Sequence, residues 1–412
     1  MTQDTTARLL DLSRLLSRVG HGPFTGVDRV EYAYLGHLLS LDAPLFGLVG
    51  TSLGQVLLDR AGIGALADRL AGKTAWGQAD LISRLSRGKT ELRRRAESDL
   101  RRLALAIALP NRTGQMLRRH LPEGAAYVNV GHSNLGHATL AGARAIRGGK
   151  VAVLIHDMIP LAHPEYTRAG QTAVFEAKMR RVGSAADLVI YNSAQSRRDG
   201  ERHFATWGRV PPGLVAHLGV DLRLSDAGSV PKQVDRGRPY FVCLGTIEPR
   251  KNHALLLDLW QEFAATLPAA QIPGLVIVGQ RGWNNAAVFT RLDALDKAGP
   301  VCELSGLSDA AVTALLQASA GLLFPSFAEG FGLPAAEAAA LGIPVLCNDL
   351  SVLREYLGEY PVYAPVTDRY LWARTIRMLA EQAGAGQKAG GQGVLPVLPT
   401  WQAHFNLVLK MT

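Results

Sequence analysis

Two glutamates, Glu329 and Glu337, flank a glycine-rich turn in a stretch that reads Glu-Gly-Phe-Gly-Leu-Pro-Ala-Ala-Glu. An apolar run precedes the turn, Pro334 suits a first helical position, and Gly342 fits the position just past a helix end. Free N–H groups and the positive end of the helix dipole favour phosphate at such a helix start. Carboxylates instead accept hydrogen bonds from sugar hydroxyls. Phosphate and hydroxyls together indicate a nucleotide sugar. The alternative is an ordinary strand–turn–helix unit with both glutamates solvated.

Two adjacent cations, Arg250 and Lys251, lie between an apolar run and a helix expected to begin near His253. The connecting residues read Gly-Thr-Ile-Glu-Pro-Arg-Lys-Asn over 245–252. An arginine can hold phosphate through a bidentate fork, and a lysine supplies a compact point charge. Both cations could therefore neutralise a diphosphate leaving group, which is the type of electrostatic stabilisation that dominates many enzyme mechanisms.

A His-Asp pair, His156 and Asp157, follows the wholly apolar run Val151–Ile155, which is typical of a buried parallel strand. Ligands of open α/β sheets bind at the carboxyl ends of strands, so this pair is well placed for chemistry. The alternative is a structural histidine bonded to the neighbouring loop.

The elements that must position these residues alternate between strand and helix, which predicts an α/β protein with two doubly wound, Rossmann-like domains facing a central cleft. We predict an N-terminal domain over 1–225, with a first strand over Leu9–Leu16 and a helical, basic insertion over 59–124. A C-terminal nucleotide-sugar domain is predicted over 226–385. A spacer and a last helix over 386–412 could cross back to the first domain.

The motifs around Arg250 and Glu329 resemble the signatures of family 4 of the retaining glycosyltransferases with the GT-B fold. The resemblance is strongest over 240–360 and extends over 9–40 and 127–221; residues 41–126 show no motif that could be compared with the family. It implies retention of anomeric configuration without a catalytic metal or another cofactor, in keeping with the absence of an Asp-x-Asp donor motif.

The resemblance also implies roles for individual residues. His156 would lie beside the donor sugar, Glu329 would bind that sugar, and Arg250 and Lys251 would hold the diphosphate. The further donor-binding residues that it implies are Gly26, Thr246, Arg281, Gly330, Phe331, Gly332, Leu333 and Glu337, the last on the ribose hydroxyls.

The segments around His156 and Arg281 look most like those of GDP-mannose users, so the resemblance favours transfer of mannose to a lipid-linked or polysaccharide glycan. A UDP-hexose donor is the first alternative, and a nucleotide-sugar epimerase of the same fold is the second. An epimerase would turn over the donor with no acceptor present.

Much of the positive charge lies between Arg84 and Arg119, within a chain that carries a formal net charge of +9. One interpretation of this basic region is a solvated helix face with Leu92, Ala96, Leu100, Leu103 and Ile107 turned inward. The other is a contact with anionic lipid on the inner face of the cell membrane. A nucleic-acid partner is disfavoured because no aromatic residue is interleaved with these cations.

Three isolated cysteines, Cys243, Cys302 and Cys347, predict a reducing compartment and neither a disulfide nor a zinc site. The N-terminus does not read as a signal peptide, and no run reaches the length of a membrane span. We therefore expect a cytoplasmic protein.

Overall fold

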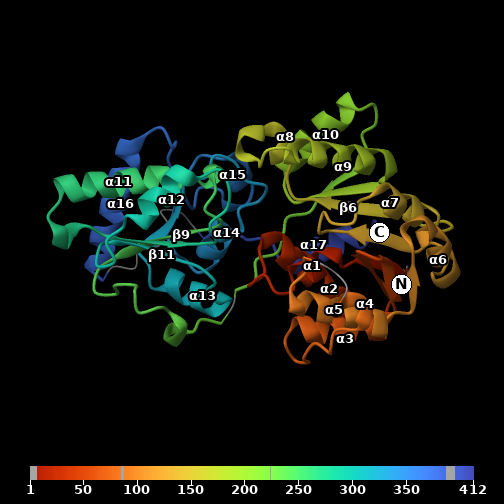
Figure 1. Ribbon diagram of the computed structural model, residues 1–412. Coiled ribbons are helices and arrows are strands. Elements are labelled where there is room, and N and C mark those ends of the chain that lie inside the picture. Colours follow the sequence, from red (N-terminus) through yellow and green to blue (C-terminus); the bar gives the residue numbers. More distant parts are fainter. Residues whose placement is uncertain (1–6, 85–87, 223, 387–394) are drawn as a thin grey trace.

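The computed structural model describes residues 7–84, 88–222, 224–386 and 395–412, and these form two α/β domains side by side (Figure 1). The N-terminal domain is built on one eight-stranded sheet with the strand order β4-β3-β2-β1-β5-β6-β7-β8. Its strands are β1 Arg8–Asp11, β2 Leu45–Thr51, β3 Gly54–Leu58, β4 Ala106–Ala108, β5 Ala126–Asn129, β6 Val151–Ile155, β7 Leu188–Tyr191 and β8 Gly213–Val215.

Helices cover this sheet because its central strands are apolar on both faces; every residue of β6, for example, is buried. The helices are α1 Ser13–Arg18, α2 Gly26–Ser40, α3 Arg60–Leu70, α4 Leu81–Arg84, α5 Glu91–Arg102, α6 Thr113–His120, α7 His137–Arg144, α8 Ile159–Ala162, α9 Gln171–Ala185 and α10 Ala194–Thr206.

In the described part of the C-terminal domain, six strands form one sheet, all parallel, in the order β11-β10-β9-β12-β13-β14. The strands are β9 Tyr240–Leu244, β10 Gly274–Val278, β11 Val301–Leu304, β12 Gly321–Phe324, β13 Val345–Cys347 and β14 Val362–Tyr363. The helices after β9 are α11 His253–Thr266, α12 Ala286–Asp293, α13 Asp309–Gln317, α14 Leu333–Ala340, α15 Ser351–Leu357, α16 Arg369–Gly384 and α17 Trp401–Val408.

Each sheet has one place where the strand order reverses. In the N-terminal sheet it lies between β1 and β5, and in the C-terminal sheet between β9 and β12. Ligands of doubly wound folds bind outside the carboxyl ends of the strands at such a reversal. The loops that carry the predicted cations and Glu329 follow β9 and β12, so they lie at the reversal of the C-terminal sheet.

Two sequence predictions for the N-terminal domain are wrong in detail. The first strand ends at Asp11, and residues from Ser13 form a helix instead of continuing it. The region 59–124 is not helical throughout, because β4 pairs antiparallel with β3 at the sheet edge. Ile107 lies on this edge strand and is half exposed, so it does not extend the apolar face of α5. Three residues are too short a strand to show a two-residue period in the sequence.

The last helix, α17, returns from the C-terminal domain and packs against the N-terminal one (Figure 1). Tyr34 of α2 contacts the ring of Phe405 edge-on, and its hydroxyl lies 2.7 Å from Nε2 of His404. Where the chain crosses back, the Val220 N–H donates to the Pro399 carbonyl. Part of the expected spacer, 387–394, lies outside the described residues.

The three cysteines are unpaired. Among the described residues, none of the helices is both long and apolar enough to traverse a bilayer.

Candidate active site between the two sheets

The cationic turn after β9 is held by backbone geometry that suits particular residues. Gly245 has φ of +146°, and a Cβ there would lie 3.2 Å from Cε of Lys251. Pro249–Lys251 forms one 3₁₀ turn, and Asn252, with φ of +52°, ends it so that α11 begins at His253. A left-handed residue is tolerated best as glycine or asparagine. The turn therefore places both cations at the carboxyl end of the sheet.

Arg250 and Lys251 are both bonded to Glu329, which comes from the loop after β12. Lys251 Nζ donates to Glu329 Oε1 at 2.5 Å, and Arg250 Nη1 lies 2.9 Å from Glu329 Oε2. A second carboxylate, Glu248, accepts from Arg250 at 2.7 Å. These side chains are 18% exposed or less, so the cluster is mostly removed from water.

Burial and ion pairing compete in setting the pKa values of this cluster. Burial alone would raise the pKa of Glu329, but Arg250 and Lys251 together lower it to about 2. Burial lowers the pKa of Lys251 although Glu329 opposes that shift. The pKa of Arg250 is raised, because Glu329, Glu248 and Asp157 outweigh its own desolvation. Glu329 and Arg250 are therefore charged at neutral pH.

The N-terminal domain contributes His156 and Asp157 from the end of β6. His156 Nε2 lies 2.7 Å from the Val130 carbonyl, so this nitrogen carries the proton and Nδ1 is the acceptor. Burial lowers the pKa of His156 to about 4, although the Val130 hydrogen bond raises it. Burial raises the pKa of Asp157, and Arg250 opposes that shift across the domain interface. His156 is thus a buried, neutral group bonded to the residue that follows β5, and its expected role beside the donor sugar stays a prediction.

Gly330 is the point where the two halves of the site touch. A Cβ on Gly330 would lie 2.2 Å from the His156 carbonyl oxygen and 2.9 Å from Cβ of Asp157, so no larger residue fits. The Gly330 carbonyl lies 3.0 Å from Oγ of Ser193, the N-cap residue of α10. The glycine-rich turn is therefore packed on the N-terminal domain as well as on its own.

The other residues of this turn are fixed by packing within the C-terminal domain. Phe331 is buried and stacks on Tyr356 with ring centroids 4.5 Å apart. Gly332 has φ of +92° and is the residue before α14, which has a proline in its first turn. Gly342 has φ of +71° just after that helix, in the position that the sequence indicated. Leu333 lies 3.6 Å from where a Cβ on Gly26 would be, so the first loop of the chain faces this turn.

Glu337, expected to bind ribose, forms an ion pair across the domain interface. Its Oε1 accepts from Nη1 of Arg29 on α2 at 2.8 Å. The other guanidinium nitrogen of Arg29 is bonded to Asp309, the first residue of α13. Arg29 therefore bridges two helices of the opposite domain.

Arg281 and Thr246 lie beside this group of residues, and neither belongs to the ion-pair cluster. Arg281 lies at the exposed edge of the C-terminal sheet, where it is bonded to Glu303 at 2.7 Å and to Asp293 at 2.7 Å. Thr246 lies against Gly282, whose added Cβ would come within 2.8 Å of its methyl group. These contacts leave the expected roles of both residues in nucleotide binding as predictions.

Several groups that complete the site were not singled out from the sequence. Glu248 stands two residues before Arg250, and this short spacing was the available signal for it. Arg29 lies within the first loop and helix that were examined, but nothing marked it as an interdomain residue. Glu355 accepts hydrogen bonds from the Ala194 N–H at 2.8 Å and from the Gln195 N–H at 2.9 Å. These contacts depend wholly on tertiary structure.

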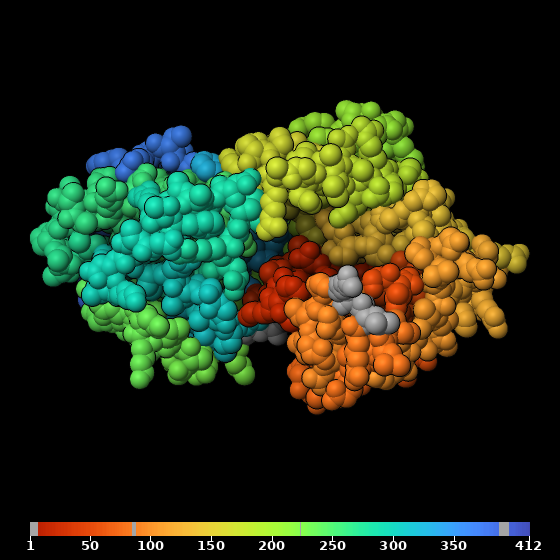
Figure 2. Space-filling view, viewed as in Figure 1, coloured from red at the N-terminus to blue at the C-terminus, as the bar shows by residue number. Residues whose placement is uncertain are grey.

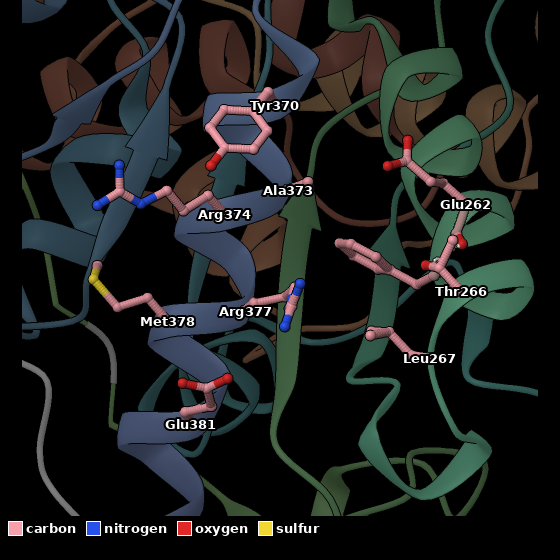
Figure 3. A pocket seen from close by; sticks show the side chains of 10 residues that line it. Glu262, Thr266, Leu267, Tyr370, Ala373, Arg374, Arg377, Met378 and Glu381 are labelled. Atoms are coloured by element: carbon pink, nitrogen blue, oxygen red, sulfur yellow. Dashed lines mark hydrogen bonds between the residues drawn. The ribbon is translucent and has the colours of Figure 1, made fainter.

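A hollow opens in the surface of the N-terminal domain. Figure 2 shows the surface hollowed between the yellow segment that includes α9 and the red segment that includes α1. A separate groove of about 370 Å³ lies between α11 and α16, on the side of the C-terminal domain away from the N-terminal domain (Figure 3). None of the residues predicted to bind the donor lines that groove. Within the described residues, no group of three His, Cys, Asp or Glu side chains is arranged to hold a metal ion.

Comparisons with known proteins show what this chain is similar to. Residues 56–389 match the model of a family described as family 4 glycosyltransferase in conflict systems. The serotype-specific mannosyltransferase WbdA of Escherichia coli is 31% identical over 232 residues, covering 52% of this chain and 28% of WbdA. The O-antigen chain mannosyltransferase B of the same organism is 27% identical over 223 residues, covering 53% and 58%. The chain thus spans well under two thirds of either relative.

Among solved structures, the Anabaena protein Alr3699/HepE in complex with UDP and glucose has a TM-score of 0.61. The match covers 98% of this chain and 99% of HepE at 15% sequence identity. At that identity the likeness concerns the fold, and it confirms the predicted GT-B arrangement of two Rossmann-like domains.

Proposed function

The chain belongs to the family 4 glycosyltransferases, and on that premise we propose that it transfers a hexose from a nucleotide sugar to a hydroxyl of a glycan with retention of configuration. We favour mannose from GDP-mannose, since the matching Escherichia coli relatives are named mannosyltransferases. The acceptor is a lipid-linked or polysaccharide glycan, and the reaction takes place on the cytoplasmic side of the membrane.

One observation carries this proposal: a cationic turn, a carboxylate and a neutral histidine from two sheets meet where the two domains touch. Arg250 and Lys251 face Glu329, while Gly330 of the same loop touches the main chain at His156. A diphosphate needs cations and free N–H groups, and a sugar needs carboxylates for its hydroxyls. Both requirements are met within a few residues.

In the proposed mechanism, the diphosphate exchanges partners with Glu329. The phosphate oxygens bind Arg250 and Lys251, which stabilise the negative charge that develops as the bond to the sugar breaks. Glu329 then accepts hydrogen bonds from the sugar hydroxyls instead of from the cations. The acceptor hydroxyl attacks the anomeric carbon from the same face as the one from which the diphosphate departs. The proton of that hydroxyl passes to the departing phosphate.

Two residues of the first domain complete the proposed site. His156 contributes its Nδ1 acceptor or its main chain to the sugar, because Nε2 is held by Val130. Gly26 lets the first loop approach the phosphates closely. Glu337 binds the ribose hydroxyls, which requires that it share or release the Arg29 guanidinium.

A thermal-shift panel of GDP-mannose, UDP-glucose and a dTDP-sugar at equal concentrations tests the donor, since a ligand that binds more tightly raises the unfolding temperature more. We expect the largest shift with GDP-mannose and no shift in Lys251→Ala. A larger shift with UDP-glucose selects the alternative UDP-hexose donor. No shift with any sugar nucleotide contradicts the proposed function. The anomeric configuration of the product, read by NMR, tests retention.

A further inference from the structure

Two cations on α9, Lys178 and Arg181, are partly buried. Lys178 Nζ donates to the His132 carbonyl at 2.9 Å, and Arg181 Nε donates to the Leu135 carbonyl at 2.9 Å. Among the residues that the structure describes, neither has a carboxylate partner. The ring of His132 lies 5.0 Å from that of His156, centroid to centroid, so Lys178 stands one residue away from the proposed reaction centre.

This lack of acidic partners is unusual within the same helix. Arg180, adjacent in sequence, lies on the exposed face and pairs with Glu176 at 2.7 Å. Its guanidinium also lies 4.8 Å from the ring centroid of Trp207. The exposed arginine, which needs a counter-ion least, has one, whereas its partly buried neighbours do not. A cation removed from water without a counter-ion is unfavourable. The arrangement is therefore explained best if a ligand supplies the anion.

The potential around Lys178 is positive from more than one side. Gly131, the residue before His132, lies against Glu31 and Arg14: a Cβ on Gly131 would come within 1.9 Å of Glu31 Oε2 and 2.6 Å of Cβ of Arg14. Arg14 and Arg18 share one carboxylate, Asp28, at 2.6 and 3.1 Å. Burial lowers the pKa of Lys178, and Arg181 and Arg14 lower it further. Glu31, also near Arg14, is buried, and desolvation raises its pKa.

We propose that Lys178 and Arg181 bind an anionic group, a phosphate or a carboxylate, on the acceptor glycan while its hydroxyl reaches the donor sugar beside His156. The inference rests on the proposed function and names its acceptor class. The hollow between α1 and α9 gives the acceptor access to this place (Figure 2). An anion here would complete the pairing of both cations and fix the register of the acceptor chain.

The test compares three acceptors that share an octyl chain: octyl mannoside, octyl mannosyl phosphate and octyl glucuronide. We expect wild type to have the lowest KM for one of the two anionic compounds, and which one it is distinguishes phosphate from carboxylate. Lys178→Gln and Arg181→Gln should each raise that KM about tenfold or more, with kcat nearly unchanged, because a charge-assisted hydrogen bond is lost. The KM for octyl mannoside should not move.

Arg180→Gln is the matched control, since it removes a cation one position away on the exposed face, and it should leave every KM unchanged. The proposal is overturned if wild type does not prefer an anionic acceptor. It is also overturned if Lys178→Gln and Arg181→Gln alter neutral and anionic acceptors alike. The unfolding temperature of each variant, measured without ligand, shows whether the fold is intact.

A second measurement separates this inference from the proposed function. In a Lys251→Ala background, inorganic phosphate at matched ionic strength should still raise the unfolding temperature, and Lys178→Gln should abolish that rise. If no glycan is ever a substrate, the proposed function fails, but a shift that depends on Lys178 still supports the anion site. No shift, or one that Lys178→Gln leaves intact, overturns the site even if transfer to glycans is observed.

Discussion

The cationic turn 248–252 and helix α5 contain the same kinds of charged residue and use them in opposite ways. In α5 the ion pairs stay within one domain: Arg102 pairs with Asp99 at 2.7 Å, and Arg101 with Asp80 at 2.6 Å. Arg95 also donates to the Gly77 carbonyl, so α5 fastens the loop before α4. In the turn, the main partner, Glu329, lies 78 residues away at the domain interface.

The comparison teaches that the density of cations is a poor guide to function and that the position of their partners is a better one. The arginines of α5 pair with carboxylates and carbonyls of their own domain, so most of their charge stabilises the fold. The membrane contact proposed for 84–119 therefore depends on exposed residues further along, such as Arg112, Arg118 and Arg119. That contact stays a prediction.

The sharpest way to break the comparison is to remove one cation from each region. Lys251→Ala should lower kcat/KM for donor turnover about 100- to 1,000-fold, because it removes stabilisation of the leaving diphosphate. Arg102→Ala, the matched control, should leave kcat/KM unchanged. Steady-state kinetics with GDP-mannose measures both. Equal losses in the two variants would mean that the turn has no special role.

The pH dependence of stability distinguishes the buried site from the surface helix. The pKa of His156 is about 4 in the folded protein against 6.5 in a free side chain. The stability that the protein has because His156 is neutral when folded is fully present above pH 6.5 and is lost as the pH falls toward 4. The reason is that His156 of the unfolded chain takes up its proton at a higher pH than His156 of the folded chain. We expect His156→Gln to remove roughly 3 kcal/mol of that pH dependence. Urea unfolding at pH 7 and pH 4 measures it, and identical pH profiles in both proteins would rule out a buried neutral histidine.

A third change should affect stability without affecting chemistry. Arg101→Gln removes a two-pronged contact with Asp80, whose pKa this arginine lowers against the effect of burial, and should cost about 1 kcal/mol. The unfolding temperature should fall by about 2–4 °C. Calorimetry and a turnover assay on the same sample provide the check. A loss of activity at full stability would place α5 in the catalytic region.

The smallest expected effect concerns the interdomain bridge. Arg29 is 28% exposed, so its pairs with Glu337 and Asp309 should stabilise the protein by less than about 1 kcal/mol. Arg29→Gln should lower the unfolding temperature slightly in low salt, and the difference should shrink in high salt as the charges are screened. A salt-independent difference would show that packing matters here more than charge.

Much of the fold follows from local sequence. Strands are specified by apolar runs such as Val151–Ile155, with little need of tertiary context. One helix is specified in the same way by Pro334 at its start and Gly342 after its end. The edge strand at Ala106–Ala108 could not be predicted this way, because only its pairing with β3 makes it a strand.

The residues of the candidate site also fall into two groups, those that a local motif predicts and those that only the tertiary structure brings together. Arg250, Lys251 and Glu329 could be proposed together because a local motif carries each of them, and the structure brings them into contact. The bridge from Arg29 to Glu337 joins residues 308 positions apart, and no local pattern encodes it. Likewise, Lys178 and Arg180 lie on different sides of α9, and which side is buried depends on how that helix packs.

The return of α17 to the N-terminal domain sets the order in which the protein can be made. Two residues early in the sequence contact this last helix or the residue after it. The Tyr34 ring packs against Phe405, and Arg8 Nη2 donates to the Leu409 carbonyl. During synthesis this surface of the N-terminal domain therefore stays uncovered until residues 405–409 have left the ribosome. Chaperones that shield apolar surface have their longest opportunity to act on α2.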